Sequence, residues 1–165
     1  MSATENQRVT VNLTVNGRAY ERTVEPRRAL SDFLREDLEL TGTHVACEHG
    51  FCGVCNILVD GQSVRSCLLF AVQMEGASIQ TVESLAAPDG TLSPLQQAFH
   101  DHAGLQCGYC TPGMLMTATE YLAEHPDGGT DDQIREAISG VLCRCTGYQQ
   151  IIESIRAAGS AAKGA

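Results

Sequence analysis

Apolar and polar residues alternate along residues 9–15, which read VTVNLTV. Alternation with a period of two is typical of a β-strand with one buried face. The dipeptide Asn16-Gly17 follows, and a second β-rich run, RAYERTV, comes directly after it. Asn-Gly between two such runs favours a type I′ turn, because both central positions need φ above zero. This part of the chain is therefore predicted to form a β-hairpin that ends at Pro26.

The next segment has a different period. In RALSDFLREDLEL, apolar residues at positions 29, 30, 33, 34 and 38 recur at helical spacing. The runs NILVDG, SVRSC and ASIQTVES then read as short strands, separated by turn residues at 60–61 and 75–76. A hairpin, a crossing helix and further short strands predict a small α+β domain over residues 1–82.

From residue 83 the sequence ESLAAPDGTLSP is rich in Pro and Gly and shows no periodicity, which is typical of a linker. Ser93-Pro94 then combines an N-cap residue with Pro at the first helical position, and Thr111-Pro112 repeats this arrangement. Two further amphipathic patterns begin at Asp131 and after Gly147. Residues 83–165 are therefore predicted to form a second domain, a bundle of four short helices.

Composition narrows the classes of function. The chain carries 20 acidic and 11 basic residues, a formal charge of −9, and no dense basic patch, which argues against nucleic-acid binding. The first residues lack the pattern of a signal peptide, and no apolar run approaches the ~18 residues of a membrane span. The sequence thus predicts a cytoplasmic protein without a membrane span.

Eight cysteines are the most informative residues of the chain. In a secreted protein they would indicate disulfides, but in a reducing compartment metal binding is the better interpretation. They fall into two sets: Cys47, Cys52, Cys55 and Cys67, and then Cys107, Cys110, Cys143 and Cys145.

The first set has the spacing C-x4-C-x2-C-x11-C. Its first three cysteines match the plant-type ferredoxin arrangement for a [2Fe-2S] cluster. Four thiolates must converge in a tight loop, and Gly50 and Gly53 supply positions that tolerate positive φ. Cys67 would supply the fourth ligand. Zinc is the alternative, but zinc sites more often combine two C-x2-C units or Cys with His.

The second set consists of C-x2-C in QCGYC and C-x-C in CRC, and each pair precedes a predicted helix. The free N–H groups and positive dipole ends of helix N-termini suit a cluster of net negative charge. On spacing alone, zinc remains an alternative for this set.

With both sets in view, the chain resembles the iron–sulfur subunit of the xanthine oxidase family of molybdenum hydroxylases. The matching stretches are TGTHVACEHGFCGVC, SVRSC, LQCGYCTPGM and GVLCRCTGY, in the family's order, with Tyr109 in place of a common phenylalanine. The resemblance implies a β-grasp, plant-type ferredoxin-like domain followed by a four-helix-bundle domain, each with one [2Fe-2S] cluster. It also implies that all eight cysteines are iron ligands, four to each cluster. Gln106 would hydrogen-bond a pterin cofactor, and Cys145 would lie near it.

The same resemblance implies partners. A large molybdopterin subunit and a medium FAD subunit would complete a heterotrimer, which in the family is often doubled. Electrons would leave molybdenum, pass through the helical-domain cluster and then the ferredoxin-domain cluster, and reach FAD. The chain itself would hold no catalytic residue, and the substrate of the whole enzyme would be an N-heteroaromatic, a purine, an aldehyde or carbon monoxide. Two other hypotheses remain: a free-standing two-cluster ferredoxin and a zinc-stabilised interaction module.

Overall fold

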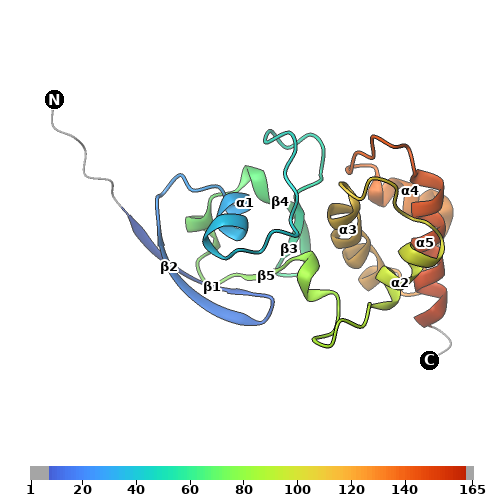
Figure 1. Ribbon diagram of the computed structural model, residues 1–165, viewed down its shortest axis with the longest axis horizontal. Coiled ribbons are helices and arrows are strands. Elements are labelled where there is room, and N and C mark those ends of the chain that lie inside the picture. Colours follow the sequence, from blue (N-terminus) through green and yellow to red (C-terminus); the bar gives the residue numbers. More distant parts are fainter. Residues whose placement is uncertain (1–7, 163–165) are drawn as a thin grey trace.

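The computed structural model of the chain describes residues 8–162, which form a sheet-containing unit followed by a helical unit (Figure 1). Five strands make one mixed sheet in the order β2-β1-β5-β3-β4. Strands β1 and β5 pair in parallel, and the other neighbouring pairs are antiparallel. The strands are β1 (Val9–Val15), β2 (Arg18–Val24), β3 (Asn56–Val59), β4 (Gln62–Arg65) and β5 (Ser78–Gln80).

The predicted hairpin forms β1 and β2. Its turn residues Asn16 and Gly17 have φ angles of 51° and 77°, as a type I′ turn requires. The alternation in the sequence places Val11, Leu13 and Val15 in the core, each at most 4% exposed. The period of two therefore identified both the strand and its buried face.

The helix predicted from residue 29 to residue 38 is wrong in its detail. Regular α-helix covers only α1 (Leu30–Asp32), and a π-helical turn, Phe33–Asp37, follows it. The amide of Leu38 donates to the carbonyl of Phe33, five residues back, at 3.1 Å. The side chains of Phe33 and Leu34, at the start of this turn, are both fully buried in the hydrophobic cluster of the sheet-containing unit.

Four helices form the second unit: α2 (Pro94–Asp101), α3 (Thr111–Glu124), α4 (Asp131–Ile138) and α5 (Tyr148–Ala162). The predicted cap of α2 is confirmed, since the Ser93 hydroxyl accepts from the Gln96 amide at 3.3 Å. The predicted cap of α3 is wrong: Thr111 lies inside the helix, and Cys110 is the N-cap residue. A cysteine of the second set therefore sits directly at a helix start.

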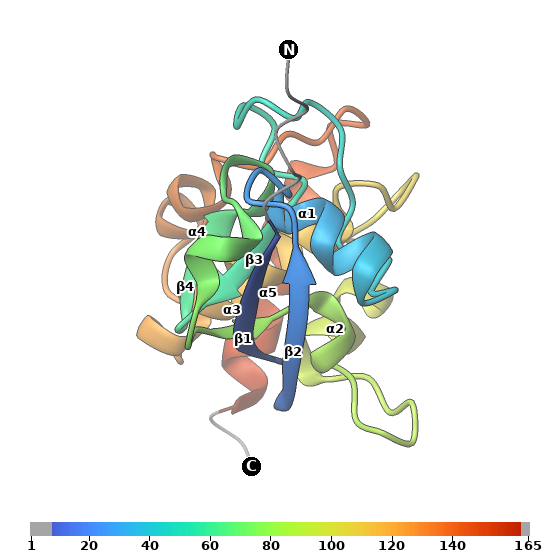
Figure 2. The same cartoon turned by 90° about the vertical axis from the view of Figure 1, so that its left-hand side faces the viewer.

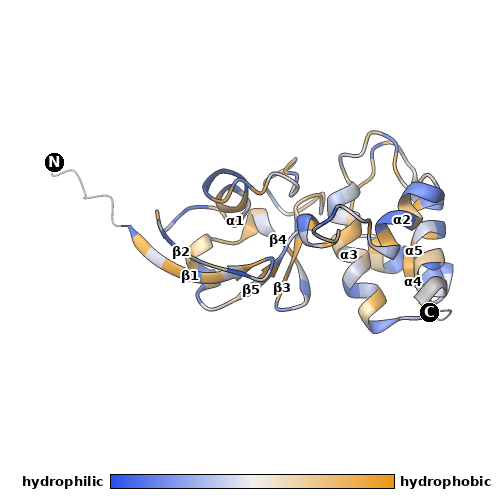
Figure 3. Ribbon diagram, turned by 60° about the horizontal axis from the view of Figure 1, so that its bottom comes forward, coloured by the Kyte–Doolittle hydropathy of each residue, from blue (hydrophilic) through white to orange (hydrophobic). Residues whose placement is uncertain are grey.

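Short 3₁₀ turns complete the fold at Ser66–Leu68, Ala71–Met74 and Val82–Ser84. Figure 3 shows β3 as a hydrophobic segment, while α2 and α4 carry hydrophilic turns. Among the described residues, no helix is both long and apolar enough to cross a membrane.

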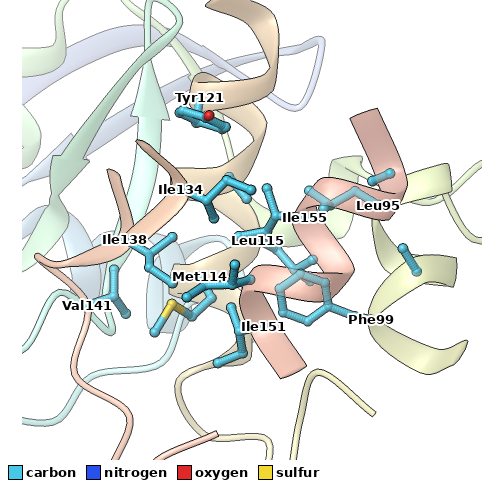
Figure 4. Close-up of a cluster of buried hydrophobic side chains, with 14 of the residues drawn as sticks. Leu95, Phe99, Met114, Leu115, Tyr121, Ile134, Ile138, Val141, Ile151 and Ile155 are labelled. Atoms are coloured by element: carbon cyan, nitrogen blue, oxygen red, sulfur yellow. The ribbon is translucent and has the colours of Figure 1, made fainter. Parts of the chain in front are cut away.

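A separate hydrophobic cluster lies inside each unit. In the helical unit, Phe99 of α2, Met114 of α3, Ile134 of α4 and Ile151 of α5 point toward one another (Figure 4). Each of these side chains is at most 1% exposed. All four helices thus contribute to one core, and this core fixes the loops that carry the second set of cysteines.

Candidate metal centres

The first cysteine loop, residues 47–55, folds back on itself through residues with positive φ. Gly50 and Gly53 have φ angles of 79° and 66°, which confirms the role predicted for these glycines. Glu48 also adopts a positive φ, 56°, although no feature of the sequence marks it. The reversals turn successive backbone N–H groups toward the cysteine sulfurs.

The four thiols of the first set interact with one another. Cys47 contacts Cys52, and Cys67 lies close to both Cys55 and Cys47. The amide of Cys52 donates to the Sγ atom of Cys47 at 3.4 Å. Ser66 ties the distant fourth cysteine to the loop, because its hydroxyl donates to the carbonyl of Cys55 at 2.8 Å. The structure therefore brings together the four residues that spacing grouped.

The backbone donors favour the thiolate form at one position of this set. Hydrogen bonds from the amides of His49 and Cys52 lower the pKa of Cys47 to about 6. Burial, followed by the neighbouring Cys55 thiol, raises the pKa of Cys67 to about 11. Amides that point at sulfur are the donors that a thiolate-bound cluster requires.

The second set is also brought together, from the α2–α3 and α4–α5 connections. Cys107 contacts Cys145, and Cys110 lies close to Cys143 and Cys107. The tight turns again need positive φ, at Gly108 (82°) and Thr146 (57°). Backbone donation from Tyr109 lowers the pKa of Cys107, whereas burial, followed by Cys143, raises the pKa of Cys110 to about 12.

Cys143 is held by the start of α5. The amide of Gly147 donates to the Sγ atom of Cys143 at 3.4 Å. The Cys143 amide donates to the Tyr148 hydroxyl at 2.8 Å, and that hydroxyl donates in turn to the carbonyl of Val141 at 3.3 Å. Tyr148 therefore orients this cysteine, a role that the sequence did not single out.

All eight cysteines are free thiols. In residues 8–162, no three His, Cys, Asp or Glu side chains form a site for a single metal ion. The thiols instead lie in contacting pairs, Cys47 with Cys52 and Cys55 with Cys67 in the first set. Paired thiols beside backbone donors fit a two-iron cluster, in which each iron takes two cysteine sulfurs.

The two cysteine sets meet across the contact between the two units. The amide of Leu142, the residue before Cys143, donates to the carbonyl of Cys52 at 2.8 Å. Gly53 lies so close to residue 140 that a Cβ atom on it would come within 2.2 Å of the Gly140 carbonyl oxygen. Gly113 of α3 approaches the Gly53 carbonyl in the same way, at 2.6 Å. Each glycine permits a backbone approach that a side chain would block.

Tyr109 adds a second connection between the sets. Its hydroxyl donates to the carbonyl of Val45 at 2.6 Å, and its ring stacks on His44 with centroids 4.8 Å apart. A hydrogen-bonding contact of 2.9 Å also joins His44 Nδ1 to the Tyr109 carbonyl. His44 is half-buried through these contacts with Tyr109.

Gln106 and Cys145, the two residues that the resemblance associates with a pterin, lie together. The Gln106 side-chain amide donates to the Cys145 carbonyl at 3.3 Å. Gln106 and Cys107 are exposed, and Cys145 is half-buried, so this side of the second set is open to solvent.

The chain matches two domain families in sequence. Residues 13–86 match the family described as "2Fe-2S iron-sulfur cluster binding domain", and residues 81–156 match the "[2Fe-2S] binding domain" family. Each matched range contains one of the two cysteine sets. The fold and the two sets thus define a protein with two [2Fe-2S] domains, one of them ferredoxin-like.

Curated relatives narrow the class further. The chain is 61% identical to caffeine dehydrogenase subunit gamma from Pseudomonas sp. (strain CBB1), with 88% of each chain covered. It is 53% identical to the nicotine 6-hydroxylase small subunit from Paenarthrobacter nicotinovorans, with 91% of this chain and 89% of the relative covered. Among solved structures, quinoline 2-oxidoreductase from Pseudomonas putida 86 contains a chain that is 50% identical. It superposes with a TM-score of 0.91, covering 96% of this chain and 98% of that one.

The protein belongs to the family of small iron–sulfur subunits of the molybdenum hydroxylases, the xanthine oxidase family. It is the electron-transfer component of a multi-subunit oxidoreductase.

Proposed function

We propose that this chain carries electrons from a molybdopterin centre on a large subunit to FAD on a medium subunit. The observation that carries this proposal is the direct hydrogen bond from the Leu142 amide to the Cys52 carbonyl. Leu142 adjoins Cys143 of the second set, so one hydrogen bond joins cysteine-bearing segments of both sets.

In the proposal, residues 1–82 form a β-grasp ferredoxin-like domain and residues 83–165 form a four-helix-bundle domain. The separate hydrophobic clusters of the two units support this division. Residues of the first set, Cys47, Cys52, Cys55 and Cys67, hold one [2Fe-2S] cluster, and Cys107, Cys110, Cys143 and Cys145 hold the other. Such a cluster supplies reversible one-electron chemistry when bound.

The chain's own residues prepare this chemistry. The Cys52 and Gly147 amides donate to cysteine sulfurs and so stabilise negative charge there. Cys52, Cys55 and Cys143 are at most 8% exposed, which keeps water from these three of the eight cysteines. Hydrogen bonds to sulfur and burial are two of the factors by which a protein sets a cluster potential.

Gln106 and Cys145 are proposed to face the pterin of the large subunit. Their mutual hydrogen bond and their place on the open side of the second set support this assignment. The helical-domain centre would then lie on the side of molybdenum, and the ferredoxin-like centre on the side of FAD. The assembly would be a heterotrimer, or a dimer of heterotrimers, working in the cytoplasm.

For the complete enzyme we propose an N-heterocyclic substrate, with an aldehyde as the alternative class. Relatives named for caffeine and nicotine are 61% and 53% identical to the chain, and the relative named for aldehydes is 42% identical. The substrate would bind on the large subunit.

The test is the metal content and spectrum of the purified chain. We expect about four irons and four sulfides and, after reduction, two distinguishable [2Fe-2S] paramagnetic signals. A colourless protein with bound zinc would overturn the proposal in favour of an interaction module. Isolation from its source with no molybdenum or flavin subunit attached would instead favour a free-standing ferredoxin.

A further inference from the structure

Arg65 lies at the junction between the two units. It is on β4, opposite the uncharged Asn56 of β3, and Cys67 of the first set follows it two residues later. Its side chain crosses to the helical unit, where the Nη2 atom donates to the Gly140 carbonyl at 3.0 Å. One side chain thus connects the strand that leads to a cysteine of the first set with the loop after α4.

Gly140 belongs to the segment that meets the first cysteine loop. Its carbonyl oxygen would lie 2.2 Å from a Cβ atom on Gly53. Two residues further on, the Leu142 amide donates to the Cys52 carbonyl at 2.8 Å, and Cys143 of the second set follows directly. The guanidinium that binds the Gly140 carbonyl therefore lies where the backbones of both cysteine sets come together.

Burial distinguishes Arg65 from most arginines of the chain. Within residues 8–160, three arginines are half-buried and the others are exposed to water. Arg28 is neutralised by Glu36 and Asp37, and Arg35 donates to two carbonyls of its own unit. Among the described residues Arg65 pairs with no carboxylate, and its Nε atom is buried without a hydrogen-bond partner.

A positive charge that is partly withdrawn from water is costly unless a negative charge lies nearby. The two cysteine sets supply that charge when they hold iron. Two ferric ions, two sulfides and four thiolates sum to a net negative charge, and reduction adds one more electron. A neighbouring cation favours the added electron, and a half-buried cation is screened less by salt than one on the surface.

We propose that the positive charge of Arg65 raises the reduction potentials of both iron–sulfur centres, so that each accepts an electron more readily. The proposal rests on the proposed function, because the two cysteine sets are assigned there as the ligands of two [2Fe-2S] clusters. The hydrogen bond to Gly140 holds the guanidinium at the junction, and the charge then acts on both centres from one place.

The test is a potentiometric titration of the purified, iron-loaded chain with dithionite, in which the two paramagnetic signals are followed separately. Arg65→Gln removes the charge. At a fixed potential, the ratio of reduced to oxidised centre should fall about tenfold for each signal, a shift of about 59 mV to a more negative midpoint. This shift should persist from about 50 mM to about 500 mM salt.

Arg65→Lys separates the charge from the contact with Gly140. Lysine keeps the positive charge but lacks the planar guanidinium. Both midpoint potentials should therefore stay close to those of the unchanged chain, while the thermal midpoint falls as it does in Arg65→Gln. If Arg65→Gln does not load both centres, Arg65→Met removes the charge from a side chain of similar length, with the same expected shift.

Arg18→Gln is the matched control, because it removes the same charge from the other edge of the sheet. Strand β2, which carries Arg18, lies away from the helical unit in Figure 1 and nearest the viewer in Figure 2, whereas β4 lies beside α3. Arg18 is exposed, so neither midpoint potential should move at about 500 mM salt.

Three outcomes would overturn the proposal. Removing the charge of Arg65 could leave either midpoint potential unchanged, or Arg18→Gln could shift both potentials equally. Arg65→Lys could also shift them as far as Arg65→Gln does, which would assign the effect to the hydrogen bond and not to the charge. An unchanged chain that shows no pair of [2Fe-2S] signals would refute the proposed function itself, before any variant is compared.

Discussion

Tyr109 stands where the resemblance in sequence suggested a phenylalanine, and its hydroxyl has a physical role. Phenylalanine could provide the stacking on His44, but not the hydrogen bond of 2.6 Å to the Val45 carbonyl. The hydroxyl thus fastens the loop of the second set to the segment that leads into Cys47. Tyr109 is 48% exposed, so this bond competes with water and its net contribution is modest.

Tyr109→Phe should therefore lower the free energy of unfolding by about 0.5 kcal/mol. This is the lower end of the usual range for one hydrogen bond, because Tyr109 is half exposed to water. Both centres should remain loaded. The measurement is the thermal midpoint of the purified chain, together with amide exchange in residues 44–47, which should become faster.

Tyr20→Phe provides the control. The ring of Tyr20 lies under Arg18 and Arg22 on the hairpin, and its hydroxyl makes no hydrogen bond within residues 8–160. An equal loss of stability in both variants would show that the Tyr109 hydroxyl contributes nothing specific.

Individual residues also show what the sequence could not predict. Gly50 and Gly53 were predictable positions of positive φ because glycine reaches that region without steric cost. Glu48 reaches it as well, with a φ of 56°, because the surrounding loop imposes it. The partner of His44 was hidden for another reason: Tyr109 lies 65 positions along the chain, and no local pattern encodes such a contact.

At the scale of elements, α3 connects the two units. Its first turn begins at Cys110 and brings Gly113 against the backbone of the first cysteine loop. Deeper in the contact, the side-chain amide of Asn56 on β3 donates to the Thr117 hydroxyl at 2.9 Å. Helix α3 thus fixes the position of Cys110 relative to β3.

Gly113→Ala should destabilise the protein, although alanine favours a helix by about 1 kcal/mol over glycine. The new Cβ would lie 2.6 Å from the Gly53 carbonyl oxygen and 2.8 Å from that of Val54, and neither backbone atom can move freely. We expect a net loss of about 1–3 kcal/mol, measured as a lower thermal midpoint. Faster proteolysis in residues 85–93 should accompany it.

Gly140→Ala makes a suitable comparison, because the nearest atom to its new Cβ would be the flexible end of Arg65 at 3.0 Å. This variant should change the midpoint much less. A stability for Gly113→Ala equal to that of the unchanged protein would mean that the helix start can shift away from the first loop.

The elements themselves were predictable to different degrees. Periodicity located β1 and α5, the Asn16-Gly17 turn located β2, and the Ser93-Pro94 pair located the start of α2. The π-turn after α1 was not predictable, since the apolar spacing of residues 29–38 equally fits an ordinary α-helix. The N-cap of α3 was predicted one residue too late. Threonine is a residue type favoured at N-caps, but the turn through Gly108 makes Cys110 the N-cap residue.

At the scale of the whole molecule, the cysteine spacing predicted both sets and their order, but not how the sets meet. That contact depends on loops separated by about half the chain, joined by Leu142 and Cys52. A serial path through the two centres has a direct consequence for variants that lose one centre.

Cys47→Ser should reduce the iron content from about four to about two per chain and remove only the ferredoxin-like signal. Cys107→Ser should remove the other signal with the same loss of iron. In the assembled enzyme, substrate should no longer reduce FAD in either variant. Metal analysis, paramagnetic spectra and flavin absorbance are the three measurements.

The two variants control for each other, because each should keep the signal that its counterpart loses. FAD that is still reduced by substrate in either variant would contradict a serial path. Loss of both signals from a single substitution would instead mean that the two centres fold as one cooperative unit.

The close approach at Gly53 and Gly113 also limits whether the two domains can be exchanged separately during evolution. Free-standing ferredoxins and helical domains could in principle recombine as modules, each bringing its own centre. Here the junction requires a residue without a side chain on each half, Gly53 in one and Gly113 in the other. A domain exchanged from another lineage would fit only if it carried glycine at its own side of the junction. We therefore expect the two domains to have evolved together, with glycine retained at both positions of the junction.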